Sequence, residues 1–200
     1  IRKAISSLKN DLKKIESHHN NQIKNRANIF KIALAGYTNS GKSTLLKELS
    51  GYNAYIKDQL FATLDTVTKK VTLPSKTNVL ISDTVGFLRK LPHNLIASFR
   101  TTLSEIIEAD LIIKVIDISS SDMDGHIETI NETLKFLDVH KTPSLYVFNK
   151  IDLIEDSNMF ELISNKYNSP ILISASSKLN INKLINEIDK LAHDKLYKIN

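Results

Sequence analysis

The chain has 200 residues, of which 42% are hydrophobic, and it contains no cysteine. This length can bury one sizeable core, so we expect one α/β domain with an appendage rather than two full domains. The lack of cysteine excludes disulfides and thiolate metal sites, and no apolar run approaches the roughly 20 residues of a membrane span. The start also lacks the apolar core of a signal peptide. These features favour a cytoplasmic protein that does not enter a membrane, and we expect a monomer. Because the chain begins at Ile1 rather than Met, we also expect it to be part of a longer protein.

Positive charge is concentrated at the start of the chain. The net charge is +5, and residues 1–31 hold eight Lys or Arg against two acidic residues, which leaves the rest at about −1. A basic segment of this kind favours a phosphate-rich partner such as RNA, and a solvated helix face is the alternative.

Apolar side chains in the same segment recur at alternating spacings of four and three, which predicts a helix with one apolar stripe. The residues of the stripe are Ile1, Ile5, Leu8, Leu12 and Ile15. We therefore expect a basic amphipathic helical segment and linker over residues 1–28, followed by a domain over residues 29–200. For the stripe we favour docking on a helix that precedes this chain, and the body of the domain is the alternative partner.

From residue 29 onwards, short apolar runs alternate with amphipathic stretches, a pattern typical of βαβ units and a mainly parallel sheet. The predicted strands cover residues 30–35, 67–73, 78–82, 111–117, 144–149 and 170–174, and the predicted helices cover 42–50, 95–108, 122–139, 157–166 and 180–197. The turn over residues 74–77 is too short for a crossover helix, so the second and third strands should form an antiparallel hairpin. The sequence thus predicts a six-stranded, mainly parallel sheet with one antiparallel strand, flanked by helices.

A glycine-rich segment joins the first predicted strand to the helix after it. It reads Gly36-Tyr37-Thr38-Asn39-Ser40-Gly41-Lys42-Ser43-Thr44, which has the G-x-x-x-x-G-K-S spacing of a phosphate loop in the required context. The backbone N–H groups of such a loop surround phosphate oxygens, and the helix N-terminus adds positive potential. We expect Lys42 to reach the β- and γ-phosphates and the Ser43 hydroxyl to bind Mg²⁺. The alternative is a glycine turn with an ordinary surface lysine, and the two motifs described next disfavour it.

A second motif, Ser82-Asp83-Thr84-Val85-Gly86, ends the third predicted strand about 40 residues after Lys42. An acidic residue at the carboxyl end of a strand can hold Mg²⁺ through water, and the Gly86 N–H can meet the γ-phosphate. The spacing places Asp83 on a strand next to the phosphate loop. We therefore predict that Asp83 belongs to the metal site and Gly86 to the phosphate site.

A third motif, Asn149-Lys150-Ile151-Asp152, ends the fifth predicted strand. It is expected to select guanine over adenine. The Asp152 carboxylate can accept from the guanine N1–H and exocyclic amine, which adenine cannot supply. Asn149 is expected to tie the loop together, and the Lys150 stem can lie over the base plane. Ser174-Ala175-Ser176 closes the last strand, where the Ala175 N–H is predicted to donate to the guanine oxygen. Together the motifs predict GTP or GDP as the bound nucleotide.

A threonine between the first helix and the second strand should complete the magnesium shell and touch the γ-phosphate, so that its loop is ordered only with GTP. Spacing leaves three candidates in residues 55–68: Thr63, Thr66 and Thr68.

Two longer strings resemble the HflX family of translational GTPases: Asp58-Gln59-Leu60-Phe61-Ala62-Thr63-Leu64-Asp65, and the eleven residues that begin at Asp83 and end at His93. The resemblance implies a P-loop GTPase fold. It also favours Thr63 as the threonine whose loop is ordered only with GTP. Thr63 would then be a metal ligand and would act in catalysis with Lys42 and Gly86. It also implies that Phe61 contacts the nucleotide. As partner it implies the ribosome, in particular the large subunit and its RNA, with the splitting of stalled or idle ribosomes under stress.

In the same family an N-terminal domain and a helical hairpin precede the GTPase domain, and residues 1–26 resemble the end of that hairpin. One alternative function is a nucleotide-gated RNA-binding or assembly module in which hydrolysis is only a timer. Another is a broader NTPase that also uses ATP through an N-terminal region, although Asp152 argues against ATP in the site predicted here.

Overall fold

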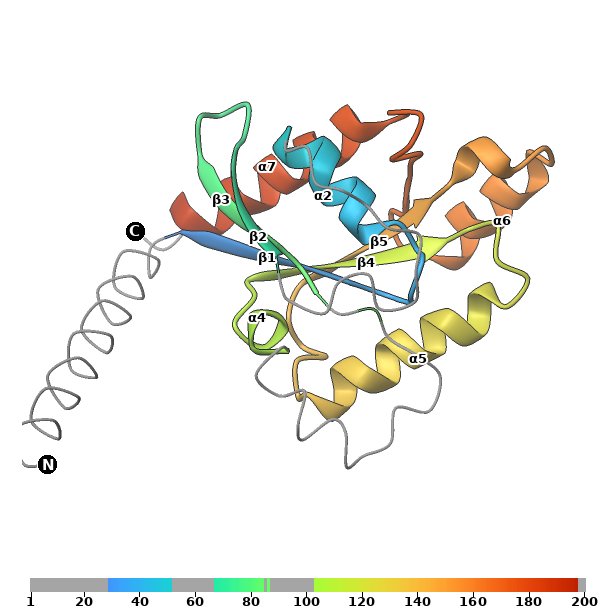
Figure 1. Ribbon diagram of the computed structural model, residues 1–200, viewed down its shortest axis with the longest axis horizontal. Coiled ribbons are helices and arrows are strands. Elements are labelled where there is room, and N and C mark those ends of the chain that lie inside the picture. The colour runs from blue at the N-terminus through green and yellow to red at the C-terminus, as the bar shows by residue number, and fades with distance from the viewer. Residues whose placement is uncertain (1–28, 52–66, 85, 87–102, 198–200) are drawn as a thin grey trace, which may run out of the picture.

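The computed structural model describes residues 29–51, 67–84, 86 and 103–197 (Figure 1). Its strands are β1 (Phe30–Gly36), β2 (Val67–Thr72), β3 (Asn78–Asp83), β4 (Leu111–Asp117), β5 (Ser144–Asn149) and β6 (Ile171–Leu172). Its helices are α2 (Lys42–Ser50), α4 (Ser104–Ile107), α5 (Met123–Phe136), α6 (Asn158–Lys166) and α7 (Ile181–Tyr197), with a short 3₁₀ helix, η1 (Ile151–Leu153).

The six strands form one sheet in the order β2-β3-β1-β4-β5-β6. Only the β2–β3 pair is antiparallel, and β1, β3, β4, β5 and β6 run parallel to one another. The short turn between β2 and β3 explains the antiparallel pair, since it leaves no room for a crossover. The predicted six-stranded, mainly parallel sheet with one antiparallel strand is confirmed.

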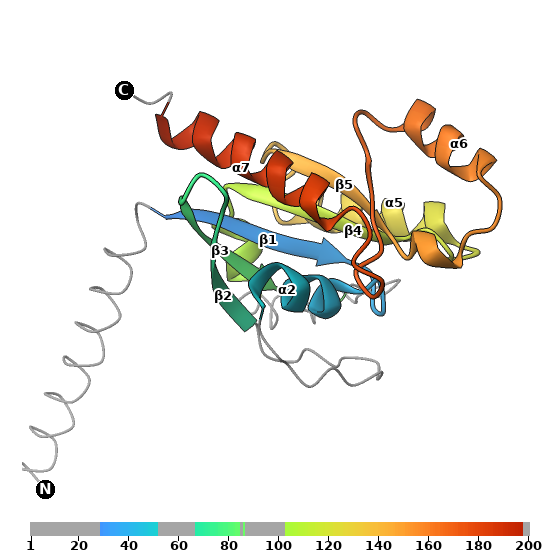
Figure 2. The same cartoon turned by 90° about the horizontal axis from the view of Figure 1, so that it is seen from above.

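Helices cover both faces of the sheet, with α2 and α7 on one face and α4, α5 and α6 on the other (Figures 1 and 2). Side chains alternate along β1, as the two-residue period of a strand requires. Ile32 and Leu34 pack in the core under α2 and α7, whereas Ala33 and Ala35 pack in the core under α4, α5 and α6. The middle strands thus bury apolar side chains on both faces. Lys114, in the middle of β4, is a buried exception whose ammonium donates to Asn131 Oδ1 at 2.9 Å.

Several elements differ in length from the prediction. The sixth strand is only two residues long, and after it Ser174 forms a backbone bridge with Leu179. Helix α5 ends at Phe136, ahead of Asp138 with its positive φ of 58°. The helix predicted over residues 95–108 appears as the four residues of α4, and its first part lies outside the described residues.

The segment predicted to be a basic helix, residues 1–28, also lies outside the described residues, so the boundary between it and the domain stays a prediction. Across the parts of the chain that are described, no helix has both the length and the apolar character needed to cross a membrane.

Candidate functional site

The predicted motifs meet at one edge of the sheet because β1, β3, β4 and β5 are parallel and their carboxyl ends lie together. The phosphate-loop segment follows β1, Asp83 ends β3, Asp117 ends β4 and Asn149 ends β5. This edge is where parallel α/β sheets bind ligands.

The loop from Gly36 to Lys42 has a backbone that requires glycine at one position. Gly41 has a φ of 93°, in the left-handed region, and a β-carbon there would overlap the side-chain amide of Asn149. A β-carbon on Gly36 would likewise overlap the Val115 carbonyl of β4. The loop therefore packs closely on both β4 and β5, and its glycines are needed for that approach.

Lys42 opens α2 and is 6% exposed. Its ammonium donates to the carbonyl oxygens of Gly36 at 3.1 Å and Tyr37 at 2.9 Å, which hold it under the loop. Burial lowers the pKa of Lys42 from 10.5 to about 8, against the opposite effect of the Asp83 carboxylate. The group still carries its charge at neutral pH, so the loop encloses a cation.

Ser43 and Asp83 lie in direct contact beside this lysine, with the Ser43 hydroxyl donating to Asp83 Oδ2 at 2.5 Å. Asp83 is buried, and the next residue, Thr84, anchors the strand end by donating from its hydroxyl to the Leu34 carbonyl at 2.7 Å. A hydroxyl and a carboxylate side by side are the hard oxygen donors that Mg²⁺ prefers. The two residues predicted as metal ligands are thus brought together, and their donor chemistry fits this ion.

Gly86 lies against the phosphate loop. A β-carbon there would stand 2.9 Å from the Thr38 Cα and 3.2 Å from the Lys42 Nζ. Such distances leave no comfortable room for a side chain, so the Gly86 backbone closely approaches both the loop and its lysine. The second motif is therefore next to the first, as the spacing predicts.

Asn149 connects the phosphate loop to the segment after β6. Its amide nitrogen donates to the Ser40 carbonyl at 2.9 Å, and its amide oxygen accepts from the Ala175 N–H at 2.9 Å. The predicted role of Asn149 as a tie between loops agrees with this geometry. The Ala175 N–H is thus already engaged, and a guanine oxygen would have to share it with Asn149.

Lys150 has a left-handed backbone with a φ of 69°, and its ammonium pairs with the Asp117 carboxylate at 2.6 Å. Asp117 has no role in the sequence prediction, yet it fixes the direction of the Lys150 side chain. The sequence shows only that Asp117 ends a predicted strand, and its place beside Lys150 follows from the register that pairs Asp117 with Asn149 of β5. Asp152 is exposed within η1, directly after this pair.

Other predicted residues also lie in this region or outside the described chain. Asn39 is exposed in the loop with a φ of 60°, Thr44 belongs to α2, and the hydroxyls of Ser174 and Ser176 are 3.1 Å apart. Phe61, Thr63 and Thr66 lie outside the described residues, so the choice of Thr63 stays a prediction.

The third threonine candidate, Thr68, is part of β2. Its hydroxyl is 2.9 Å from the hydroxyl of Ser82, its partner in register on β3. This pairing holds Thr68 in the sheet, which disfavours it as the threonine of a mobile switch.

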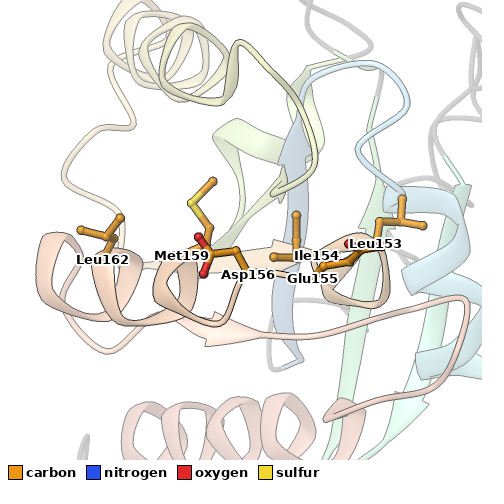
Figure 3. A pocket seen from close by; sticks show the side chains of 6 residues that line it. All are labelled: Leu153, Ile154, Glu155, Asp156, Met159 and Leu162. Carbon is orange, nitrogen blue, oxygen red and sulfur yellow. The ribbon is translucent and has the colours of Figure 1, made fainter.

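An apolar pocket of about 370 Å³ lies between η1 and α6 (Figure 3). The residues around it are Leu153, Ile154, Glu155, Asp156, Met159 and Leu162. None of them is predicted to bind phosphate, base or metal. The pocket therefore adds no residue to the predicted site.

The close approach of Gly41 to Asn149 leads to a first prediction. We expect Gly41→Ala to lower the affinity for guanine nucleotides about tenfold or more, because the new methyl group displaces the amide that ties the two loops. A matched control is Gly51→Ala, which also places alanine at a positive φ (64°) but has no atom within 4 Å of the new carbon. Nucleotide titration and thermal unfolding of both variants separate the two effects, since the backbone strain of roughly 1–2 kcal/mol is common to them. Equal affinities in the two variants would contradict this role of Gly41.

Comparison with known proteins agrees with the geometry. The model of the family described as 50S ribosome-binding GTPase matches residues 31–150. The GTPase HflX of Caldanaerobacter subterraneus subsp. tengcongensis is 43% identical over 95% of this chain and 44% of its own length. The GTPase HflX of Escherichia coli is 38% identical over 78% of this chain and 37% of its own. The chain thus spans less than half the length of these curated relatives.

Among solved structures, a GTP-binding protein from the hyperthermophilic archaeon Sulfolobus solfataricus, in complex with GDP, superposes with a TM-score of 0.62. It is 30% identical, and the match covers 97% of this chain and 62% of that one. The likeness extends over the edge of the sheet where the three motifs meet. On the family model and these relatives, the chain belongs to the 50S ribosome-binding GTPases and, among them, to the HflX family.

Proposed function

We propose that this chain binds GTP with Mg²⁺, hydrolyses the GTP to GDP and phosphate, and serves as the nucleotide-dependent part of a ribosome-associated factor. The observation that carries the proposal is the cluster of Lys42, Ser43 and Asp83. A buried cation and a hydroxyl at the start of α2 and a carboxylate at the end of β3 lie within one small region.

The phosphate end of the nucleotide is assigned to this cluster. The loop N–H groups and the Lys42 ammonium would bind the β- and γ-phosphates, with the Gly86 N–H added at the γ-phosphate. Mg²⁺ would be held by Ser43, by Asp83 through water and by Thr63, and when bound it neutralises charge that develops on the phosphate oxygens. The chain's own part is to position the phosphates and to offer a fixed positive potential.

The base end is assigned to Asp152, Lys150 and the segment of Ser174, Ala175 and Ser176. The Asp117 carboxylate orients the Lys150 ammonium at 2.6 Å, which leaves the Lys150 stem free to lie along a base. Asn149 holds the base segment and the phosphate loop at a fixed separation through its two amide contacts. Asp152 would prefer guanine, because adenine leaves its carboxylate without donors.

Hydrolysis requires a water molecule to attack the γ-phosphorus as the bond to the β-phosphate oxygen breaks. Ras-like GTPases orient this water with a glutamine directly after the Asp-x-x-Gly sequence, where this chain has Phe87. A phenyl ring cannot accept a proton or hold water in line. We therefore infer that the chain alone hydrolyses GTP slowly. Its partner would supply the group that positions the attacking water.

The proposed partner is the ribosome, in particular its large subunit. Membership of the 50S ribosome-binding GTPases supports it, and so do the eight Lys or Arg of residues 1–31, which suit RNA. The alternative is a nucleotide-gated RNA-binding or assembly module in which hydrolysis acts as a timer. Both share the same nucleotide site, and they differ in whether the ribosome accelerates turnover.

Single-turnover GTP hydrolysis, with and without large ribosomal subunits, tests the proposal. We expect the isolated chain to turn over at or below roughly 10⁻³ s⁻¹, by analogy with unassisted Ras. Large subunits should raise this rate at least tenfold. Phe87→Ala should leave the basal rate within a few-fold, because the ring performs no chemistry. Fast turnover by the isolated chain that collapses in Phe87→Ala would contradict this interpretation, and a rate unaffected by subunits would favour the alternative module.

A further inference from the structure

A ring-stacking contact joins the phosphate loop to helix α5 and has no part in the function proposed above. The rings of Tyr37, the second residue of the loop, and His126, in the first turns of α5, have centroids 3.8 Å apart and planes inclined by 14°. Both residues are partly buried. The two side chains therefore lie face to face, in a geometry that differs from the tilted aromatic pairs elsewhere in the described chain.

The His126 ring is itself held in place. Its Nδ1 is 3.3 Å from the Ser120 hydroxyl, which also accepts from the Asp122 N–H at 3.3 Å in the connection between β4 and α5. The backbone N–H of His126 donates to the Asp122 carbonyl at 3.0 Å, which ties this turn of α5 to the same connection. The ring is thus fixed to the loop that follows β4, and it offers Tyr37 a defined surface.

The main chain of Tyr37 faces the predicted chemistry. Its carbonyl accepts from the Lys42 ammonium at 2.9 Å. The next residue, Thr38, is the neighbour that leaves no room for a side chain on Gly86. The His126 ring therefore packs against the side chain of Tyr37. The main chain of Tyr37 and Thr38 contacts Lys42 and Gly86.

We propose that the Tyr37–His126 stack is a positioning contact of the nucleotide site, which holds the loop in the shape that retains the terminal phosphates. This inference rests on the proposed nucleotide binding. His126 touches neither phosphate nor base in this account and acts through Tyr37 and Lys42. A change in helix α5 would therefore alter how tightly the phosphate loop holds the nucleotide.

Release of nucleotide tests the contact more directly than overall stability does. Fluorescent GDP and GTP analogues bound to the chain are chased with excess unlabelled nucleotide, and thermal unfolding of each variant is measured without nucleotide. We expect His126→Ala to accelerate release about three- to tenfold, the effect of losing one stacked aromatic pair. His126→Phe keeps a flat ring over Tyr37 and should restore the rate to within about twofold. His140→Ala, which removes a half-exposed histidine beyond the end of α5, is the matched control and should change nothing.

A double-mutant cycle completes the experiment. Tyr37→Leu should accelerate release as His126→Ala does, and the two changes together should add little, because they remove the same contact. Full additivity would overturn the inference. So would an unchanged release rate in His126→Ala, or a failure of His126→Phe to restore it while the unfolding temperature recovers. If the unaltered chain does not bind nucleotide at all, it is the proposed function that fails.

Discussion

Replacing Lys42 with methionine is expected to lower the affinity for GDP and GTP by at least about 100-fold while the domain still folds. Charge-assisted hydrogen bonds are each worth roughly 1.5–3 kcal/mol, and the ammonium is positioned to serve two phosphate groups. Each 1.4 kcal/mol is a tenfold change in affinity, so the loss of both contacts reaches this magnitude. Titration of fluorescent GDP and GTP into the two proteins measures the loss.

The stability of the same variant provides an internal check. Burial lowers the pKa of Lys42 to about 8, so the folded protein bears a cost for keeping this charge at neutral pH. Methionine keeps the apolar stem and removes the charge, and the nucleotide-free variant should therefore unfold within a few degrees of the unaltered chain or above it. Lys47→Met on the same helix is the matched control and should leave affinity unchanged. Unaltered affinity in Lys42→Met would show that the Gly36–Lys42 loop does not bind the phosphates.

The second large effect is expected at the base. We expect Asp152→Asn to weaken GTP binding roughly 10- to 100-fold, because the hydrogen bonds to a charged carboxylate, worth about 1.5–3 kcal/mol, are lost. The same change should improve the binding of xanthine nucleotides, since a carboxamide can donate to the xanthine oxygen where a carboxylate can only accept. Competition between GTP and XTP for the bound fluorescent nucleotide measures both effects in one series.

Glu155→Gln is the control for this substitution. Glu155 is an exposed acidic residue three positions after Asp152, and its neutralisation changes the local charge by the same amount. If the electrostatic field of the loop alone decides the preference, both variants will weaken GTP equally. An exchange of preference confined to Asp152→Asn is the outcome that a base-reading carboxylate predicts, and its absence would assign the base to another residue.

The sequence predicted the sheet and the meeting of the motifs because both depend on local patterns. The carboxyl ends of parallel strands lie at one edge of the sheet, which is why the phosphate loop after β1, Asp83 at the end of β3 and Asn149 at the end of β5 meet there as expected. The short turn between β2 and β3 was likewise sufficient to predict an antiparallel pair. The two-residue length of β6 was not predictable from its apolar run, which gave no sign of the bridge that Ser174 forms with Leu179.

Contacts between side chains distant in sequence were the features that the sequence could not provide. The pairing of Asp117 with Lys150 depends on the register between β4 and β5, and the stack of Tyr37 on His126 depends on how α5 packs against the face of the sheet. The hydrogen bond from the Ala175 N–H to the Asn149 side-chain oxygen was also not predictable, because it depends on the fold of the last loop. Thr63 remains a prediction from the family resemblance.

Competition binding is the sharpest test of whether this chain holds a magnesium-dependent guanine-nucleotide site. Fluorescent GDP is bound to the chain of residues 1–200 and displaced with GDP, GTP or ATP, with Mg²⁺ present and after its removal by a chelator. We expect GDP and GTP to displace the probe at least about 100-fold more effectively than ATP, and we expect removal of Mg²⁺ to weaken GTP binding. Displacement by ATP at the same concentration as GTP would contradict the assignment of Asp152 and, with it, the guanine site.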